Sequence, residues 1–439
     1  MFPTGPVQQR DTTTSEVAVP EPSDLALRYH RGNIALWGLD VVLSLLVPGA
    51  ILFTGASSRI RNIAARWGRG RWLRTTALYG LLYLVLVSVA LLPFSWYAGY
   101  VRAHQYGLSN QSAGMWLGDW AKALMVGAVV IVLVLWIPYL LLRKSPRRWW
   151  LWTGMATAPL AALALIVGPI WIAPLFDRFG PMQDKALETR ILSLAERAGI
   201  RGTRVYEVNK SEDTKLVNAY VTGIGGTKRI VLWDTLIARL TPDQVAFVMA
   251  HEMGHYVLNH TLLIIIGAAV TATLSLYAVH RLAGRLIARY RRRFGFDRLD
   301  DVASLPLLLL VGGLVSFVIT PAVLAFSRWQ EHEADRFALE LTRDNRAGAE
   351  TFVRLQQENL SVPRPGLLYT LWLGSHPSLA SRIEFANRYR PWATGGKLRY
   401  EHLFDRALIP ERAVVDTVVN STHKDAGRPE GRSHTRGPG

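Results

Sequence analysis

The amino-acid sequence predicts a polytopic α-helical membrane protein with an inserted α+β domain. Three observations predict this fold class: six long apolar stretches, two less apolar segments, and a basic charge concentrated between the apolar stretches. Of the 439 residues, 50% are hydrophobic and only 19% are charged, which is below the roughly 25% charged residues of a soluble domain. The absence of cysteine excludes a disulfide scaffold, a cysteine nucleophile and a thiolate metal site.

The apolar stretches are long enough to cross a membrane. A transmembrane helix needs about 20 mostly apolar residues to cross about 30 Å of hydrocarbon. Six stretches meet this requirement, at residues 33–55, 76–100, 123–142, 149–173, 261–279 and 303–326. Only the first contains a charged residue, Asp40. A set of buried core helices is the alternative, but six such stretches in one chain favour membrane spans.

The rest of the chain divides at these spans. The N-terminal segment is polar and contains Pro3, Pro6, Pro20 and Pro22, so we expect it to be disordered. From the N-terminus, the expected units are this disordered segment (1–32), four spans (33–173), an α+β segment (174–260), two spans (261–326), a mainly helical segment (327–408) and a disordered basic tail (409–439).

The first of the two less apolar segments has both strand and helix patterns. Alternating apolar residues predict three strands, at 203–208, 216–222 and 228–233. Gly225 and Gly226 lie between the last two strands and predict a hairpin turn. A helix is expected before the strands, at 185–198, and another after them.

Basic residues are concentrated in three loops between the spans. Seventeen of the 50 Lys and Arg residues lie in the loops 56–75, 143–148 and 280–302, which alternation of the spans places on one side of the membrane. The positive-inside rule makes that side cytoplasmic and places both less apolar segments on the opposite side. The alternative is that these arginines only anchor lipid headgroups. No Gly-rich phosphate loop or nucleic-acid module is visible, so the basic charge indicates membrane lipid and not nucleic acid as a partner.

The helix after the strands has a clear beginning and carries the strongest chemical signal. Thr241 is a suitable N-cap, Pro242 suits the first turn, and Gln244 completes a capping box. The motif HEMGH follows on the same helix, at residues 251–255. A helix with two exposed histidines is the alternative to a chemical role for this motif.

The spacing of this motif suits metal-dependent hydrolysis. His251 and His255 stand one helical turn apart, so both imidazoles can reach one Zn²⁺ ion at about 2.0–2.1 Å. Glu252 then points toward the open coordination position, where it can accept a proton from water. The inserted domain is therefore expected to be a zincin-like metallopeptidase domain.

A catalytic zinc needs a third protein ligand. One class of such enzymes uses a third histidine at the position occupied here by Thr261, so that class is excluded, and His260 is one residue short. The gluzincin class uses a glutamate from a later helix. Glu331 and Glu333 both follow the sixth span directly, and spacing alone does not choose between them. An acidic interfacial helix is the alternative explanation of this stretch.

Seven short pieces of the chain, in the same order, resemble the type I CAAX prenyl protease family of integral-membrane zinc metallopeptidases, which is similar to the heat-shock membrane metallopeptidases. These pieces are QYGLS (105–109), IAPLFDRF (172–179), NAY (218–220), RIVLWDTL (229–236), the histidine motif, EHEAD (331–335) and SHP (375–377).

The resemblance implies roles for particular residues. It selects Glu331 as the third ligand of one Zn²⁺ per chain, and it places Asp335 where its carboxylate can orient a zinc-bound imidazole. Asn218, Ala219 and Tyr220 correspond to an edge strand that binds the substrate peptide.

Two further side chains correspond to groups that stabilise charge in the family. Asn218 can donate a hydrogen bond to the developing oxyanion, and His376 matches a family histidine proposed to stabilise the same charge. A histidine in a Ser-His-Pro turn is otherwise more often structural.

The sequence also departs from the family pattern. Eukaryotic members are described with one more span and with a catalytic domain that faces the cytosol. The arginine-rich loops here favour an extracytoplasmic catalytic domain, and we expect the protein to lie in a bacterial cell membrane. These differences weaken the expectation of prenylated substrates.

The expected function is that of a membrane-embedded zinc endopeptidase acting on membrane-associated or lipidated peptides or proteins. Quality control of misfolded membrane proteins is an alternative substrate class. A non-catalytic membrane scaffold would be marked by loss of Glu252 or of a ligand, and none is lost. A transporter would show paired halves, and the sequence has no such repeat.

Overall fold

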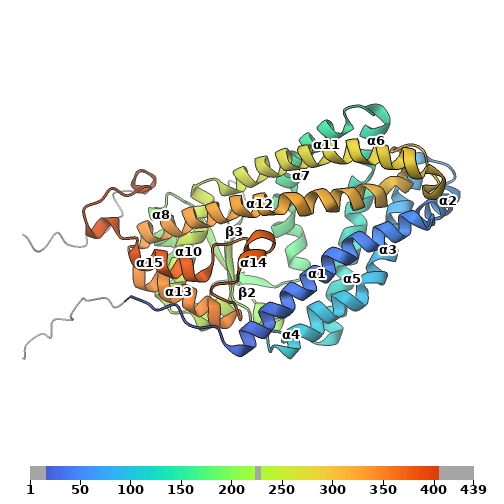
Figure 1. Cartoon of the computed structure of the whole chain (residues 1–439). Helices are drawn as coiled ribbons and strands as arrows, with labels where there is room; N and C mark the ends of the chain where they lie inside the picture. The colour runs from blue at the N-terminus through green and yellow to red at the C-terminus, as the bar shows by residue number, and fades with distance from the viewer. Residues whose placement is uncertain (1–15, 223–228, 405–439) are drawn as a thin grey trace, which may run out of the picture.

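The computed structural model describes residues 16–222 and 229–404. Long helices form one part of the elongated molecule, and shorter helices around a small sheet form the other part (Figure 1). The amphipathic helix α2 (Ala56–Trp67) lies at the end of the molecule farthest from the sheet (Figure 1). The expected fold class, a polytopic helical membrane protein with an inserted α+β domain, is confirmed.

The prediction of six spans is confirmed, because six helical stretches of the described chain are long and apolar enough to cross a membrane. They are α1 (Asp24–Phe53); α3 (Trp72–Trp96), continued by η1 (Tyr97–Val101) and α4 (Arg102–Gln105); α5 (Ala113–Val134) with α6 (Trp136–Lys144); α7 (Trp149–Val167), continued by η2 (Gly168–Ile172) and η3 (Ala173–Leu175); α11 (His260–Phe294); and η6 (Val302–Ser304) with α12 (Leu305–Thr342).

The ordered chain begins earlier than the sequence predicts. We expected disorder up to residue 32, but α1 begins at Asp24, with Ser23 as its N-cap. The segment before α1 also has a partner, since the side chain of Asn387 bonds to both the backbone N–H and the C=O of Val17, at 3.1 and 2.9 Å. The expectation is wrong for residues 16–32, because a capped helix extends α1 beyond its apolar stretch. The predicted C-terminal tail lies outside the described residues.

The sheet contains the three predicted strands and one that the sequence did not indicate. Its order is β1-β2-β4-β3, with β2 parallel to β4 and the two outer pairs antiparallel. The antiparallel pairing of β3 with β4 agrees with the predicted hairpin, whose turn at Gly225 and Gly226 lies outside the described residues. The strands are β1 (Phe179–Pro181), β2 (Arg204–Val208), β3 (Ala219–Thr222) and β4 (Arg229–Trp233).

The helices around this sheet come from the middle and the C-terminal part of the chain. They are α8 (Lys185–Arg197), α9 (Asp234–Arg239), α10 (Pro242–Val257), α13 (Asn345–Glu358), α14 (Leu367–Trp372) and α15 (Leu379–Arg388), with short turns η4 (Lys210–Glu212), η7 (Pro391–Ala393) and η8 (Glu401–Leu403). The capping box predicted for the histidine helix is present, since the Thr241 side chain accepts from the N–H of Gln244 and the Gln244 side chain accepts from the N–H of Thr241.

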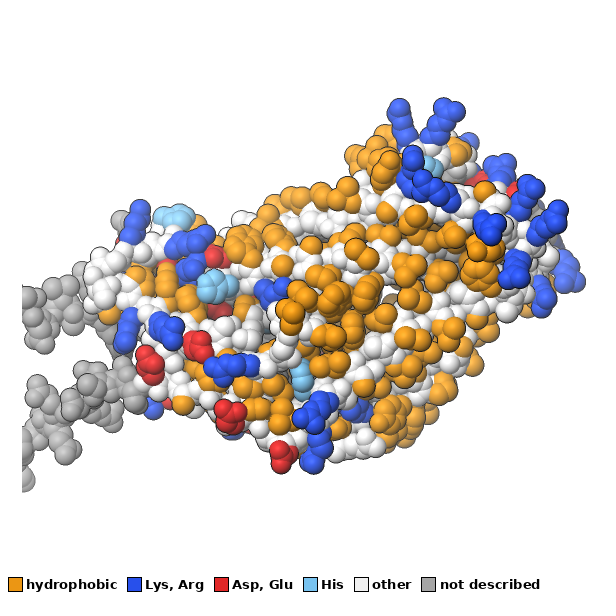
Figure 2. Space-filling view, viewed as in Figure 1, with side chains coloured by type: hydrophobic (Ala, Val, Ile, Leu, Met, Phe, Trp, Pro, Cys, Tyr) orange, Lys and Arg blue, Asp and Glu red, His pale blue; other side chains and the backbone are white. Residues whose placement is uncertain are grey.

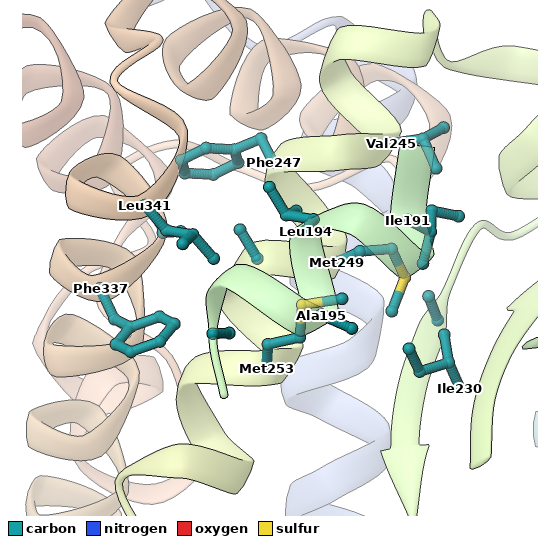
Figure 3. Close-up of a cluster of buried hydrophobic side chains, with 14 of the residues drawn as sticks. Ile191, Leu194, Ala195, Ile230, Val245, Phe247, Met249, Met253, Phe337 and Leu341 are labelled. Atoms are coloured by element: carbon teal, nitrogen blue, oxygen red, sulfur yellow. The ribbon is translucent and has the colours of Figure 1, made fainter. Parts of the chain in front are cut away.

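The apolar core around the sheet packs against the histidine helix, α10. Ile191 of α8, Ile230 of β4, Met249 and Met253 of α10, and Phe337 of α12 are all buried in one apolar cluster (Figure 3). Each such side chain stabilises the fold by about 1.5–3 kcal/mol relative to an exposed one. Because α10 and α12 share this cluster, the face of α10 that carries the histidines is held against α12.

The two helices that carry His251, His255 and Glu331 are joined directly to the spans or continue one of them. α10 ends at Val257 and α11 begins at His260, with Asn259 in the left-handed region at φ 56° to make the bend. α12 has 38 residues, so it is about 57 Å long at 1.5 Å per residue and exceeds the roughly 30 Å of hydrocarbon. Its C-terminal part therefore leaves the membrane as a rigid continuation of the span.

Candidate metal centre and substrate cavity

Three donor side chains converge where α10 packs against α12. The Nε2 atoms of His251 and His255 lie 3.1 Å apart. Glu331 faces both rings, with Oε2 at 3.2 Å from His251 Nε2 and Oε1 at 3.4 Å from His255 Nε2. The structure thus brings together the two histidines of the motif and the glutamate that the resemblance selected.

This arrangement fits a bound cation. Donors about 2.0–2.2 Å from a tetrahedral ion lie about 3.3 Å from one another, which is close to the separations among these atoms. Oε2 of Glu331 is buried and accepts no hydrogen bond from the described residues. A buried carboxylate oxygen without a hydrogen bond is costly, and a cation among the three donors would satisfy it.

The electrostatics of His251 also favour a positive charge here. Burial alone would lower the pKa of His251, but the adjacent carboxylates of Asp335 and Glu331 outweigh burial and raise that pKa from 6.5 to about 10. The site therefore stabilises a positive charge next to His251, whether it is a proton or a metal ion.

Asp335 lies one turn beyond Glu331, as the resemblance implies. Its Oδ1 is 2.9 Å from His251 Nδ1, on the side of the ring that faces away from Glu331. The carboxylate is only 1% exposed and is held by Arg382, whose Nε and Nη2 donate to its two oxygens at 2.8 and 2.6 Å. The bidentate ion pair with Arg382 thus holds the Asp335 carboxylate beside the Nδ1 atom of the His251 ring.

Arg382 is a residue of this site that was not predicted from the sequence. This arginine is buried, its guanidinium lies 4.2 Å over the Phe352 ring, and its Nη2 is 3.9 Å from Oε2 of Glu331. A buried aspartate requires a partner, but nothing local in the sequence shows which of many arginines supplies it.

The structure separates the two glutamates that spacing left open. Glu333 points away from the histidines, pairs with Arg336 and Arg399, and accepts a hydrogen bond from Tyr400. His260, which is one residue short of the position of a third histidine ligand, lies with its Nδ1 2.9 Å from Nδ1 of His255. It contacts the ring nitrogen of His255 that faces away from Glu331.

Glu252 lies on the same helix between the two histidines and is half-buried. Burial raises the pKa of its carboxyl, although the neighbouring His251 and His255 oppose this shift. A carboxylate with a raised pKa is better suited to accept and return a proton near neutral pH.

A cavity of about 510 Å³ opens beside the donors. Asn218, His376 and Arg382 all line it, so the two side chains expected to face substrate charge lie on one cavity. Nε2 of His376 is 3.3 Å from Oε2 of Glu331, and its Nδ1 lies 2.8 Å from Oγ of Ser375. Tyr29, from the first turns of α1, lines the same cavity.

β3 is an edge strand of the sheet, as the resemblance implies. The backbone N–H of Trp233 donates to the C=O of Asn218, so the paired groups of this ladder belong to Asn218 and Tyr220. The backbone groups of Ala219 and Val221 therefore point to the free edge. Oδ1 of Asn218 accepts a hydrogen bond from the N–H of Ala219 at 2.8 Å.

The fold and this site define a class of protein, the membrane metallopeptidases with an HExxH helix and a glutamate on a later helix. Residues 181–390 match the model of peptidase family M48, and residues 16–178 match a family described as CAAX prenyl protease N-terminal, five membrane helices. The structure has four of its six candidate spans over that second stretch. The chain belongs to peptidase family M48 and is a membrane metalloprotease of the CAAX prenyl protease-like type.

Relatives span most of the chain. It is 34% identical to the uncharacterized metalloprotease YhfN of Bacillus subtilis, over 87% of this chain and 90% of that protein. It is 28% identical to CAAX prenyl protease 1 of Saccharomyces cerevisiae and 32% identical to the homologue of that protease from Arabidopsis thaliana, covering 72% and 68% of those proteins. Its fold is similar to the crystal structure of Ste24p from S. mikatae, with a TM-score of 0.74 at 23% identity, over 84% of this chain and 92% of that one.

Proposed function

We propose that His251, His255 and Glu331 bind one zinc ion and that this ion and Glu252 together hydrolyse peptide bonds. The convergence of two imidazoles and one carboxylate within 3.1–3.4 Å of one another carries this proposal. The nitrogen and oxygen donors, without any thiolate, are those of catalytic zinc sites. Asp335 and Arg382 keep the His251 ring in the orientation that a metal requires.

When bound, zinc polarises the scissile carbonyl and increases the acidity of water. Glu252 accepts the proton of the attacking water and returns it to the leaving amine, a contribution of about 10²–10⁴-fold to the rate. His376 and Asn218 face the same cavity and can donate hydrogen bonds to the oxyanion that develops on the substrate.

The substrate backbone is proposed to bind along the free edge of β3. The outward N–H and C=O groups of Val221 and the outward C=O of Ala219 can pair with an extended peptide, as in other cases of strand addition, whereas the Ala219 N–H donates to the Asn218 side chain. The backbone groups of Tyr220, by contrast, stay in the ladder with β4. This mode of binding recognises backbone and leaves side-chain selection to the cavity walls.

The substrate class is proposed to be a membrane-associated peptide with a large apolar group near the cleavage site. A second cavity of about 1210 Å³ lies between α7, α11 and α12, and apolar side chains dominate its walls. Trp149 lines it near the arginine-rich end, and Gln330, next to the ligand Glu331, lines it at the other. An apolar chain in this cavity would extend from Gln330, the residue before Glu331, into the membrane. The names of the curated relatives, CAAX prenyl proteases, support a lipidated substrate.

We further propose that the metal centre lies on the extracytoplasmic side. Basic side chains gather at the end of the molecule around α2, opposite the sheet, with an apolar surface between the two ends (Figure 2). The positive-inside rule places that basic end in the cytoplasm.

The test compares cleavage of three substrates by purified, zinc-loaded protein: a farnesylated peptide, the same peptide without the lipid, and a denatured membrane protein. The expected result is faster cleavage of the farnesylated peptide than of its unmodified form, with loss of cleavage in a chelator. Preferential cleavage of the denatured protein would instead support quality control. Absence of cleavage of all three would contradict the proposed activity.

A further inference from the structure

A proline leaves one backbone carbonyl of α12 without its helical partner. In an α-helix the C=O of one residue accepts from the N–H four residues later, which for Phe317 is Pro321. Proline has no N–H, so the carbonyl of Phe317 has no donor within its own helix. Phe317 lies inside the stretch expected to cross the membrane, where water does not supply a replacement.

The side chain of Trp372 supplies the missing donor. Its indole Nε1 donates to the carbonyl oxygen of Phe317 at 3.1 Å. The two aromatic rings also stack, with centroids 5.4 Å apart and planes inclined by 25°. Trp372 is the last residue of α14, so this bond docks α14 against a membrane-spanning part of α12.

The exposed surface of α14 agrees with this location. Leu367 and Leu368 are 74% and 48% exposed, and both belong to the first turn of α14. Such side chains are costly in water but suit a lipid environment. The exposed leucines of α14 therefore suit contact with lipid, while Tyr369 and Thr370 of the same helix line the 510 Å³ cavity.

Further bonds from α12 hold the chain that follows α14. Nη1 of Arg328 donates to the carbonyls of Thr370 and Gly374 at 2.6 and 2.8 Å. Oγ of Ser327 donates to the carbonyl of Ser375 at 2.9 Å. The next residue is His376, whose Nε2 lies 3.3 Å from Oε2 of Glu331.

The docked segment follows α12 toward the metal centre. Its contacts on α12 begin at Phe317 and end at Glu331, 14 residues apart, which corresponds to about 21 Å of helix. The Trp372 bond fixes the end of this segment that lies in the membrane. The other end of the segment carries His376, which lies next to Glu331.

We propose that Pro321 and Trp372 form a latch that holds α14 as the membrane-side wall of the substrate cavity and thereby positions His376. Trp372 is a positioning residue, because it acts on the reaction through the segment that carries His376. This inference rests on the proposed role of His376 in peptide hydrolysis.

The test uses Trp372→Phe, which keeps an aromatic ring against Phe317 and removes only the N–H. Trp37→Phe is the matched control, because Trp37 also stacks on the Phe317 ring, with centroids 6.3 Å apart, and lines neither cavity. Pro321→Ala, alone and combined with Trp372→Phe, completes a double-mutant cycle, since alanine restores a helical N–H for the Phe317 carbonyl.

Two readouts do not depend on activity. The first is the melting temperature of the purified protein in detergent. The second is the mobility of a spin label at Leu367→Cys, which is site-specific because the chain has no cysteine. We expect Trp372→Phe to lower the melting temperature of the parent protein, and to lower that of the Pro321→Ala variant by less. The label should become more mobile whenever Trp372 is replaced.

The third readout is cleavage of the farnesylated peptide. We expect Trp372→Phe to reduce kcat at least tenfold with unchanged zinc content, and Pro321→Ala to restore the melting temperature of the double variant but not its kcat. If Trp372 had only a structural role, Pro321→Ala would restore both the melting temperature and the kcat of the double variant.

Equal effects of Trp372→Phe and Trp37→Phe, or an unchanged label mobility in Trp372→Phe, would overturn the latch. If the parent protein cleaves none of the substrates, the proposed function fails, whereas the melting and mobility measurements still decide whether the latch exists.

Discussion

At the scale of single residues, the candidate metal centre contains carboxylates that are buried and need compensating positive charge. Glu331 and Asp335 are both buried and would be strongly destabilising without compensation. Arg382 compensates Asp335 by a bidentate ion pair, whereas Glu331 has one oxygen that accepts no hydrogen bond from the described chain. This asymmetry supports the proposal that Glu331 binds an ion and that Asp335 orients a ligand.

Replacing Glu252 by glutamine tests the general base. Glutamine has nearly the same shape but cannot accept the proton, so kcat should fall by about 10²–10⁴-fold while the zinc content stays unchanged. Metal analysis and a cleavage assay on the same preparation check both parts. Normal turnover by Glu252→Gln would contradict the mechanism.

Replacing Asp335 by asparagine tests the ligand-orienting pair. The change leaves the buried Arg382 without its partner, which costs about 3–5 kcal/mol, and it weakens zinc binding by about 10–100-fold. Competition with a chromogenic chelator measures the affinity, and thermal unfolding measures the stability. Glu350→Gln, in an exposed pair with Arg346, is the control and should change neither. A zinc affinity equal to that of the parent would show that Asp335 does not orient His251.

The site residues whose spacing is local could be predicted from the sequence. His251 and His255 are four residues apart on one helix, so the i, i+4 rule is sufficient to place both histidines on one face, and Glu252 follows from the HExxH motif. Glu331 and Glu333 are two residues apart on the same helix and point in different directions, which only the rotation of α12 against α10 decides. Arg382 is 47 residues from Asp335, and no local pattern indicates that pair.

At the scale of elements, β3 shows how pairing on one edge leaves binding groups on the other. Its alternation of backbone groups leaves Ala219 and Val221 with outward N–H and C=O groups, while Tyr220 stays in the ladder with β4. The strand pattern of the sequence predicted β2, β3 and β4. It did not indicate β1, because a three-residue strand has too few alternations to be recognised.

Replacing Val221 by proline tests substrate binding at this edge. Proline removes an outward N–H and leaves the ladder with β4 in place, so the fold should persist while KM rises at least tenfold. Val221→Ala keeps the N–H and should change KM little, whereas Tyr220→Pro removes a ladder N–H and should destabilise the sheet. A normal KM in folded Val221→Pro protein would show that the peptide does not pair at that position.

At the scale of the whole molecule, two long helices, α11 and α12, connect the membrane-spanning part to the candidate metal centre. α12 carries apolar residues that cross the membrane and then presents Glu331, while α11 begins directly after the histidine helix. Hydropathy was sufficient to predict all six spans because each has a long, nearly uncharged apolar stretch. It could not show that α1 begins at Asp24, because the added turns are polar and depend on the cap at Ser23.

The proposed facing of the molecule can be tested by labelling. Because the chain has no cysteine, Glu196→Cys on the exposed surface of α8 and Arg291→Cys at the arginine-rich end of α11 each introduce a single thiol. In sealed right-side-out vesicles, a membrane-impermeant maleimide should label Glu196→Cys and should label Arg291→Cys only after the vesicles are opened. The reverse pattern would place the metal centre in the cytoplasm.

The most direct test of the central claim is the metal content of the purified, folded protein, measured by elemental analysis beside Glu331→Gln and Glu333→Gln variants. We expect close to one zinc per chain in the parent and in Glu333→Gln, and strong loss of zinc in Glu331→Gln. A folded parent protein without stoichiometric metal after exposure to zinc, or full zinc retention in Glu331→Gln, would contradict the metal centre on which the proposed chemistry depends.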